Sequence, residues 1–133
     1  MNREILFRGK KSNGRWVYGS LVVSENIAPA IYYEVGKGLV KQLDWCYVKP
    51  DTVGQYTGLK DKNRKKIFEG DILYQGAKML GVVCISARYG ISIQKKSSTW
   101  SLINFVLDSD FDAGVLSDIE VRGNIYDNSE LMK

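Results

Sequence analysis

Short runs of strand-forming residues, separated by Gly and Asn, constrain what this chain can fold into. Val, Ile, Thr, Tyr, Phe and Trp gather in runs of about four to eight residues, which is the usual length of a strand. The chain has 13 Gly and only 2 Pro, which argues against a low-complexity or collagen-like sequence. The sequence therefore predicts a mainly β fold of small barrel-like or sandwich-like sheets, with at most short helices.

Turn residues divide the chain into successive strand candidates. Turns are expected at 13–14, 36–38 and 87–90, and Pro50 with Asp51 marks a break. The runs that predict further strands are 30–33, 39–48, 53–57, 72–74, 79–86, 91–94 and 119–123. Residues 100–107 fit either a strand or two helical turns. Residues 128–131 predict a capped terminal turn.

The first turn carries the strongest local signal, because Asn followed by Gly is the preferred pair for a two-residue hairpin loop. Such a loop at 13–14 would set Ser12 opposite Arg15 and Gly9 opposite Tyr18. This register would separate aromatic from basic side chains. It places Phe7, Trp16 and Tyr18 on one face, and Arg8, Lys10 and Arg15 on the other.

The length of 133 residues corresponds to about one domain at roughly 150 residues per domain. We therefore expect a single compact unit over 1–133, and the break near residue 50 leaves open a division into two β subdomains. No apolar run reaches the roughly 18 residues of a membrane span. The apolar run near the N-terminus is also too short for the core of a signal peptide. We expect a cytoplasmic protein with no membrane partner.

Charge is distributed unevenly along the chain. The formal net charge is +4, but residues 1–66 carry +7 and residues 67–133 carry −3. A basic half is compatible with nucleic-acid binding, and it is equally compatible with an ordinary solvated face.

Histidine is absent, which removes the commonest general base and the commonest metal ligand. The only cysteines, Cys46 and Cys84, lie in apolar stretches and are too few for a structural zinc site. We expect two buried free thiols in a reducing cytoplasm, with a disulfide as the alternative. No metal, cofactor or catalytic residue is expected, and an enzyme is disfavoured.

Two acidic motifs could suggest metal chemistry. Asp108, Asp110 and Asp112 have the opening spacing of a calcium loop, but Gly and Glu are missing from the later positions that the loop requires. Glu69 and Asp71 flank a glycine, where carboxylates usually accept backbone N–H groups of the turn. Both motifs are interpreted as structural.

Residues 53–72 read VGQYTGLKDKNRKKIFEGDI. This stretch resembles the signature of the YopX family, small proteins encoded mainly by bacteriophages and prophages. The resemblance continues in FRGK at 7–10, WVYG at 16–19 and GNIYDN at 123–128, and so spans nearly the whole chain. It implies a mainly β protein that tends to self-associate, with no established activity and no site residues to carry over. EGDIL at 69–73, followed by GVV at 81–83, also resembles the entry of an SH3-like barrel in the C-terminal half.

Arg64 departs from the family pattern, which usually has Gly at this position. The spacing after Asp61 fits a type I turn followed by one residue in the left-handed region. The sequence therefore predicts a positive φ at Arg64, which is unfavourable for a residue with a Cβ.

The family segment also holds the candidate interaction patch. Its polar part lies between Gly54 and Gly58, and its basic part lies at a predicted hairpin tip over 60–66. The patch consists of Gln55, Tyr56, Thr57, Lys62, Arg64, Lys65 and Lys66.

We expect a non-enzymatic protein-interaction or assembly module that acts as a homo-oligomer, because exposed strand edges in a small β protein can pair with another chain. The protein partner is unknown. The alternative is a nucleic-acid-binding accessory protein that uses the basic N-terminal half and the 60–66 hairpin.

Overall fold

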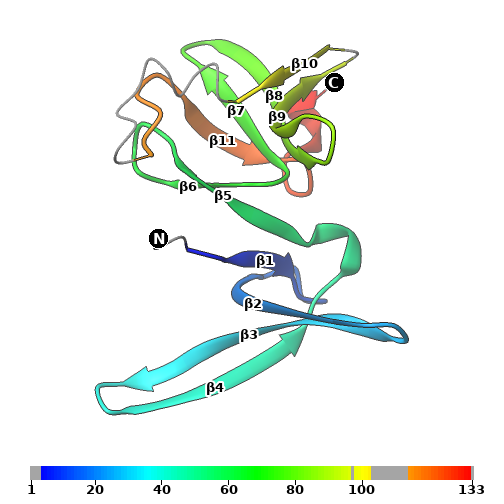
Figure 1. Ribbon diagram of the computed structural model, residues 1–133, viewed down its shortest axis with the longest axis vertical. Helices are drawn as coiled ribbons and strands as arrows, with labels where there is room; N and C mark the ends of the chain where they lie inside the picture. The colour runs from blue at the N-terminus through cyan, green and yellow to red at the C-terminus, as the bar shows by residue number, and fades with distance from the viewer. Residues whose placement is uncertain (1–3, 97, 103–113, 133) are drawn as a thin grey trace. The chain divides into compact units, whose positions relative to one another are not determined.

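The computed structural model describes residues 4–96, 98–102 and 114–132. These residues form eleven strands and two short 3₁₀ helices, which confirms the mainly β prediction (Figure 1). The chain divides into two compact units, Met1–Tyr56 and Thr57–Lys133. No helix among the described residues has the length and apolar character needed to cross a membrane.

Unit 1 is an antiparallel sheet built almost entirely from hairpins between consecutive strands. Its strands are β1 (Phe7–Lys10), β2 (Trp16–Ser24), β3 (Ile27–Lys37), β4 (Val40–Tyr47) and the first residues of β5 (Gly54–Lys60), with the 3₁₀ helix η1 (Pro50–Thr52) before β5. The strand order is β4-β3-β2-β1-β5, so β4 lies at the outer edge. Ile31 and Val48 are buried here, and Gly9 leaves room for Val48, since a Cβ on Gly9 would lie 2.9 Å from that side chain.

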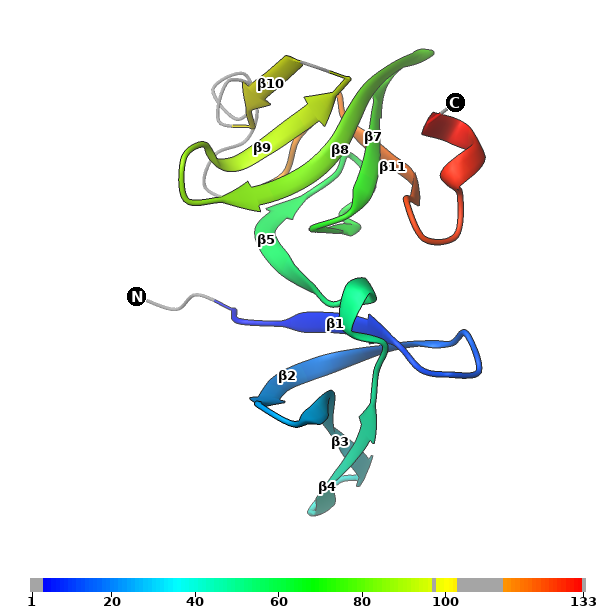
Figure 2. The ribbon, with the colours of Figure 1, turned by 90° about the vertical axis from the view of Figure 1, so that its right-hand side faces the viewer.

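Unit 2 contains an antiparallel five-stranded sheet of order β10-β9-β8-β7-β11 (Figure 2). The strands are β7 (Asp71–Gln75), β8 (Lys78–Ser86), β9 (Gly90–Lys95), β10 (Ser98–Ser101) and β11 (Glu120–Asn124). The short strand β6 (Lys66–Phe68) adjoins the end of β5, and the 3₁₀ helix η2 (Ser129–Met132) follows β11. The core of this unit is formed by buried apolar side chains from several strands and from the segment before β11: Ile67, Leu73, Leu80, Val83, Ile93, Leu102, Leu116, Ile119 and Val121.

The predicted barrel-like or sandwich-like sheets are two open antiparallel sheets within the described residues, and the SH3-like element is not confirmed. The ambiguous segment 100–107 begins as the end of strand β10 and then leaves the described part of the chain. The calcium-like motif Asp108, Asp110 and Asp112 lies outside the described residues.

The loop between β1 and β2 has three residues and not the two that were expected. The N–H of Gly14 donates to the carbonyl of Lys11 at 2.9 Å, and the N–H of Lys11 donates to the carbonyl of Arg15 at 2.9 Å. Gly14 has a φ of 86°, so it takes the left-handed position after a type I turn. The side chain of Asn13 accepts the N–H of Arg15 at 3.0 Å, which stabilises this longer loop.

The longer loop shifts the register by one residue. Gly9 pairs with Val17 and Arg8 pairs with Tyr18, so the predicted pairing of Gly9 with Tyr18 is wrong. Because neighbouring residues on a strand point to opposite faces, a one-residue shift changes which side chains meet. Lys10 pairs with Trp16, and basic and aromatic side chains therefore share a face that the sequence had assigned to aromatics alone.

Both cysteines are free thiols, so the disulfide alternative is not adopted. The prediction that both thiols are buried is wrong, because each cysteine is only half-buried. Cys46 lies on the outer strand β4, beside which the described residues place no further strand. Burial, and next the charge of Glu69, raise the pKa of the Cys84 thiol.

The carboxylate of Asp61 holds the loop between β5 and β6 against β11. Asp61 is 1% exposed. Its Oδ1 accepts the N–H groups of Asn63 and Lys65, each at 2.9 Å, and its Oδ2 accepts the N–H of Val121 at 3.0 Å. Three of its acceptor positions are thus filled by backbone donors, two from its own loop and one from a strand 60 residues away.

The same loop confirms the predicted conformation of Arg64. The N–H of Arg64 donates to the carbonyl of Asp61 at 2.9 Å, and the N–H of Asp61 donates to the carbonyl of Lys65 at 2.8 Å. Arg64 has a φ of 63°, in the left-handed region that favours glycine.

Asp71 has a structural role of the kind expected for a turn carboxylate. It is 1% exposed, and its Oδ2 accepts the N–H of Phe68 at 2.7 Å. Gly70 between them has a φ of 94°, which permits the sharp reversal from β6 into β7.

Replacing Asp61 by Ala should lower the free energy of unfolding by about 2–4 kcal/mol, because the buried N–H of Val121 loses its acceptor and the loop loses two further bonds. Denaturant unfolding of the two proteins measures this difference. The matched control is Asp118→Ala, at an exposed carboxylate, which should change stability by less than about 0.5 kcal/mol. Equal midpoints for the Asp61 and Asp118 variants would contradict the role of Asp61.

Replacing Arg64 by Gly should stabilise the protein by about 1 kcal/mol, since Gly occupies the left-handed region without the Cβ penalty. A higher melting temperature is the expected observation. Arg64→Ala removes the same side chain but keeps the Cβ, so it should give no comparable gain. The explanation fails if the Gly variant melts at or below the wild-type temperature, or if Ala stabilises as much as Gly.

Candidate interaction surface

The polar part of the predicted patch lies on β5, and all three of its residues take part in the sheet. Gln55 is half-buried and pairs with Phe7 of β1. Tyr56 is 6% exposed. The hydroxyl of Thr57 donates to the carbonyl of Ile67 at 2.8 Å and accepts the N–H of Leu59 at 3.1 Å. The side chains of Tyr56 and Thr57 therefore contribute mainly to packing and to the pairing of β5 with β6.

The basic part of the predicted patch lies in the loop between β5 and β6 and on the first residue of β6. Arg64 and Lys65 are exposed, and Lys66 is half-buried. The Nζ of Lys62 lies 3.1 Å from an oxygen of Glu120 on β11. Hydrogen bonds from Lys62, and next from Arg122, hold the pKa of the Glu120 carboxyl below its usual value. Part of the positive charge of this loop is thus already balanced within unit 2.

A cation–aromatic cluster on β1 and β2 was missed in the sequence because of the register error. The guanidinium carbon of Arg8 lies 4.5 Å from the ring centroid of Trp16, and the Nζ of Lys10 lies 5.6 Å from it. Arg8 is only 5% exposed, so this cation packs within unit 1 and is not available to bind a large external anion. The cluster stabilises the β1–β2 hairpin.

A group of exposed large apolar side chains lies on the hairpin arm, defined here as β3, β4 and the turn between them (residues 27–47; Figure 1). Every residue of β4 is exposed except Cys46, which is half-buried. Leu39, Val40 and Leu43 are 105%, 80% and 68% exposed. Solvent-exposed apolar side chains are ordinary when scattered, but a contiguous group on one element marks an interaction surface.

Aromatic side chains form one face of the arm. Tyr32 and Trp45 pair across the two strands, and their rings stack with centroids 6.0 Å apart. The ring of Tyr47 meets that of Trp45 edge-on, with centroids 5.0 Å apart. The opposite face carries Tyr33 beside Asp44, and the pKa of the Tyr33 phenol is raised by partial burial and by that carboxylate.

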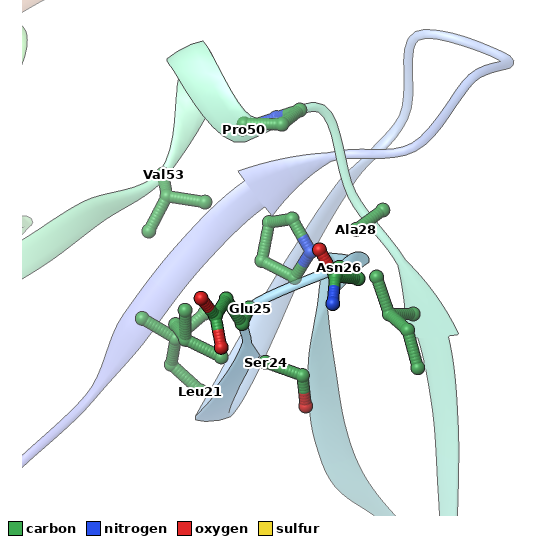
Figure 3. A pocket seen from close by; sticks show the side chains of 10 residues that line it. Leu21, Ser24, Glu25, Asn26, Ala28, Pro50 and Val53 are labelled. Carbon is green, nitrogen blue, oxygen red and sulfur yellow. The ribbon is translucent and has the colours of Figure 1, made fainter.

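An apolar pocket of about 630 Å³ lies at the other end of β3 (Figure 3). Its walls come from β2, the start of β3 and the segment around η1, and include Leu21, Val23, Ile27, Pro29, Pro50 and Val53. Glu25 and Asn26, in the turn between β2 and β3, supply polar groups to the pocket. All of these residues belong to unit 1, so the pocket is formed by this unit alone.

No group of three or more His, Cys, Asp or Glu side chains suited to a metal ion occurs in the described part of the chain. The carboxylates of Asp61 and Asp71 instead accept backbone N–H groups. The candidate interaction surface is therefore the arm, with its exposed apolar side chains, together with the apolar pocket at its base.

Comparison with known proteins supports the architecture. The crystal structure of protein EF1440 from Enterococcus faecalis is similar, with a TM-score of 0.54 and 18% sequence identity over 99% of this chain and 100% of that one. At this identity the likeness concerns the fold. A search of curated proteins found no significant match. The family model described as YopX protein matches residues 6–133, nearly the whole chain. The chain belongs to the YopX protein family.

Proposed function

We propose that this chain is a non-enzymatic assembly module that acts as a homo-oligomer, of the type encoded by phages and prophages, in the cytoplasm of a bacterial host. The observation that carries the proposal is β4, an eight-residue strand at the outer edge of its sheet and exposed along almost its whole length. Its outward N–H and C=O groups face no further strand among the described residues.

Edge strands of this kind pair readily with another chain unless something blocks them. Natural proteins protect an edge with proline, several charges, a bulge or a covering element. β4 contains no proline, and its register with β3 runs without a bulge from Ala30 and Tyr47 to Lys37 and Val40. Its only charged residues are Lys41 and Asp44, and Lys41 pairs with Glu34 at 3.7 Å. The edge is therefore open to a second strand, except at the N–H of Trp45, which donates to the Oδ1 of Asp44 at 2.8 Å.

A second copy of β4 can satisfy this edge by antiparallel pairing about a two-fold axis. Centring the axis on Leu43 places Leu43 opposite its own copy and Lys41 opposite Trp45 of the second chain, which are favourable apolar and cation–aromatic pairs. Centring it on Asp44 would oppose two like charges, which is unfavourable. The side-chain pattern of β4 thus favours the Leu43-centred register.

The non-enzymatic part of the proposal is supported by the roles of the acidic residues. Lys, Asp and Glu are the principal acid–base groups of a chain without histidine. Asp61 and Asp71 are both buried and bind backbone donors, which is a structural use of a carboxylate.

Light scattering should give a solution mass of at least twice the 15.0 kDa of the chain at micromolar concentrations. Leu43→Glu should raise the dissociation constant at least about tenfold, because two carboxylates then meet at the axis. Tyr89→Glu, an exposed aromatic at the turn between β8 and β9, is the matched control and should leave the mass unchanged. A wild-type mass near 15.0 kDa throughout would exclude self-association.

Nucleic-acid binding is a second candidate, favoured by the exposed Arg64 and Lys65 in one loop and by the aromatic face of the arm. We expect no binding tighter than the non-specific range of about 10⁻⁴–10⁻⁶ M at physiological salt. Fluorescence anisotropy with single- and double-stranded oligonucleotides at several salt concentrations measures this. Salt-sensitive binding tighter than that range, and lost in the double variant Lys65→Glu with Lys66→Glu, would favour the nucleic-acid function over assembly.

A further inference from the structure

A further pocket, of about 250 Å³, lies on the five-stranded sheet of unit 2. Its lining residues come from four neighbouring strands, β7 to β10, which Figure 2 shows side by side. They are Gln75, Lys78, Met79, Leu80, Lys95 and Trp100. All of them belong to unit 2, so the pocket is formed by this unit alone.

The pocket continues the face of the sheet that carries the core. Residues two apart on a strand point to the same face, so Lys95 shares the face of Ile93 on β9. On β7, Gln75 shares the face of Leu73 for the same reason. Trp100 pairs with Ile93 and therefore lies on this face too. Leu73 and Ile93 are fully buried, whereas Gln75 is exposed and Lys95 is half-buried, so the core face ends here in polar groups.

The apolar part of the pocket consists of an indole ring and two flexible or aliphatic side chains. Trp100 is 44% exposed, so part of its ring is accessible although it lies on the core face. Leu80 is 7% exposed, and Met79 is half-buried. A flat apolar ligand suits this surface, because aromatic rings pack well on an indole and a thioether adapts to the shape of its neighbour.

Lys95 brings to the pocket a positive charge that no carboxylate among the described residues balances. Its Nζ donates to the carbonyl of Met79 at 3.3 Å, which holds the amine at the pocket. An ammonium group has three donors, so two remain for a ligand. Neither Lys95 nor Lys78 forms an ion pair within the part of the chain that the structure describes, and no acidic residue is among those that line the pocket. The charge of the pocket therefore favours an anion.

We infer that this pocket binds a small aromatic carboxylate, whose ring packs against Trp100 while its carboxylate accepts hydrogen bonds from Lys95 and Lys78. The volume of about 250 Å³ has room for a bicyclic aromatic acid. Two amines, one of them already bonded to a carbonyl, match one carboxylate better than a phosphate with its three acceptor oxygens. The inference is independent of the assembly proposal, because the arm belongs to unit 1.

Indole-3-carboxylate is a suitable probe, and indole-3-carboxamide is its neutral analogue of nearly the same shape. The chain has 3 Trp, so NMR of ¹⁵N-labelled protein gives one indole N–H signal for each, and Trp100→Phe identifies that of Trp100. We expect the carboxylate to shift the Trp100 signal alone, with a dissociation constant below about 1 mM. It should bind at least about tenfold more tightly than the carboxamide, because the amide carries no charge.

Two variants test the charged and the aromatic part separately. Lys95→Met keeps an unbranched side chain without the ammonium group, so it should bring the two dissociation constants within about twofold of each other. Both ligands are compared in the same variant, so a change in its stability does not mimic this result. Lys65→Met, at an exposed lysine outside the pocket, is the matched control and should keep the full preference. Trp100→Ala should weaken binding of the carboxylate at least about tenfold, as followed at the backbone amide signal of Lys95.

Several results would overturn the inference. The absence of any shift of the Trp100 signal at millimolar ligand would exclude the site. Equal binding of the carboxylate and the carboxamide by the wild type, or a preference that survives Lys95→Met, would exclude the proposed role of the charge. Inorganic phosphate that perturbs the same signals and binds more tightly than indole-3-carboxylate would assign the pocket to phosphate groups instead.

Discussion

The carboxylate of Asp61 joins parts of unit 2 that the chain order keeps far apart. It accepts two N–H groups from its own loop and one from Val121. The N–H of Lys62 adds a second link, donating to the carbonyl of Ile119 at 2.8 Å. These bonds fix the conformation of the loop, including the left-handed Arg64, and bring Lys62 within 3.1 Å of Glu120. The positions of the basic residues in this loop therefore depend on one buried acceptor, because a buried donor without a partner is costly.

Two loops show how far local sequence can predict this fold. Residues 61–65 were expected to form a type I turn closed by a left-handed residue, and they do, even though Arg takes the place of Gly. Residues 12–14 form the same kind of loop, but Asn13 and Gly14 also fit a two-residue loop, and the choice between them was wrong. The two alternatives differ by one residue, and that difference exchanges the faces of a strand. Local propensity located the strands and turns, but it could not select the register.

The arm shows why the candidate surface was harder to predict than the fold. Residues 42–45 of β4 alternate polar and apolar side chains, as a half-buried strand would. In the structure Trp45 and Tyr47 are about half exposed, since β4 is the last strand of its sheet and few described residues cover it. The alternation of apolar and polar residues predicts that one face of a strand is apolar. It does not predict whether that face is covered by the same chain. The predicted patch on β5 shows the opposite case. Tyr56 and Thr57 have polar side chains, which suggested an exposed surface, but Tyr56 is buried and Thr57 bonds to a neighbouring strand.

The order of strand pairing has a consequence for how the chain folds as it is synthesised. Unit 1 pairs β1 with β2, β2 with β3 and β3 with β4, so most of its sheet closes between neighbours in the sequence. The sheet of unit 2 is instead completed only when β11 pairs with β7, which requires that residues 120–124 have been synthesised. Contacts between residues distant in sequence form slowly, since a long loop has to close first. We therefore expect unit 1, with its arm, to reach its native pairing while unit 2 is still incomplete on the ribosome.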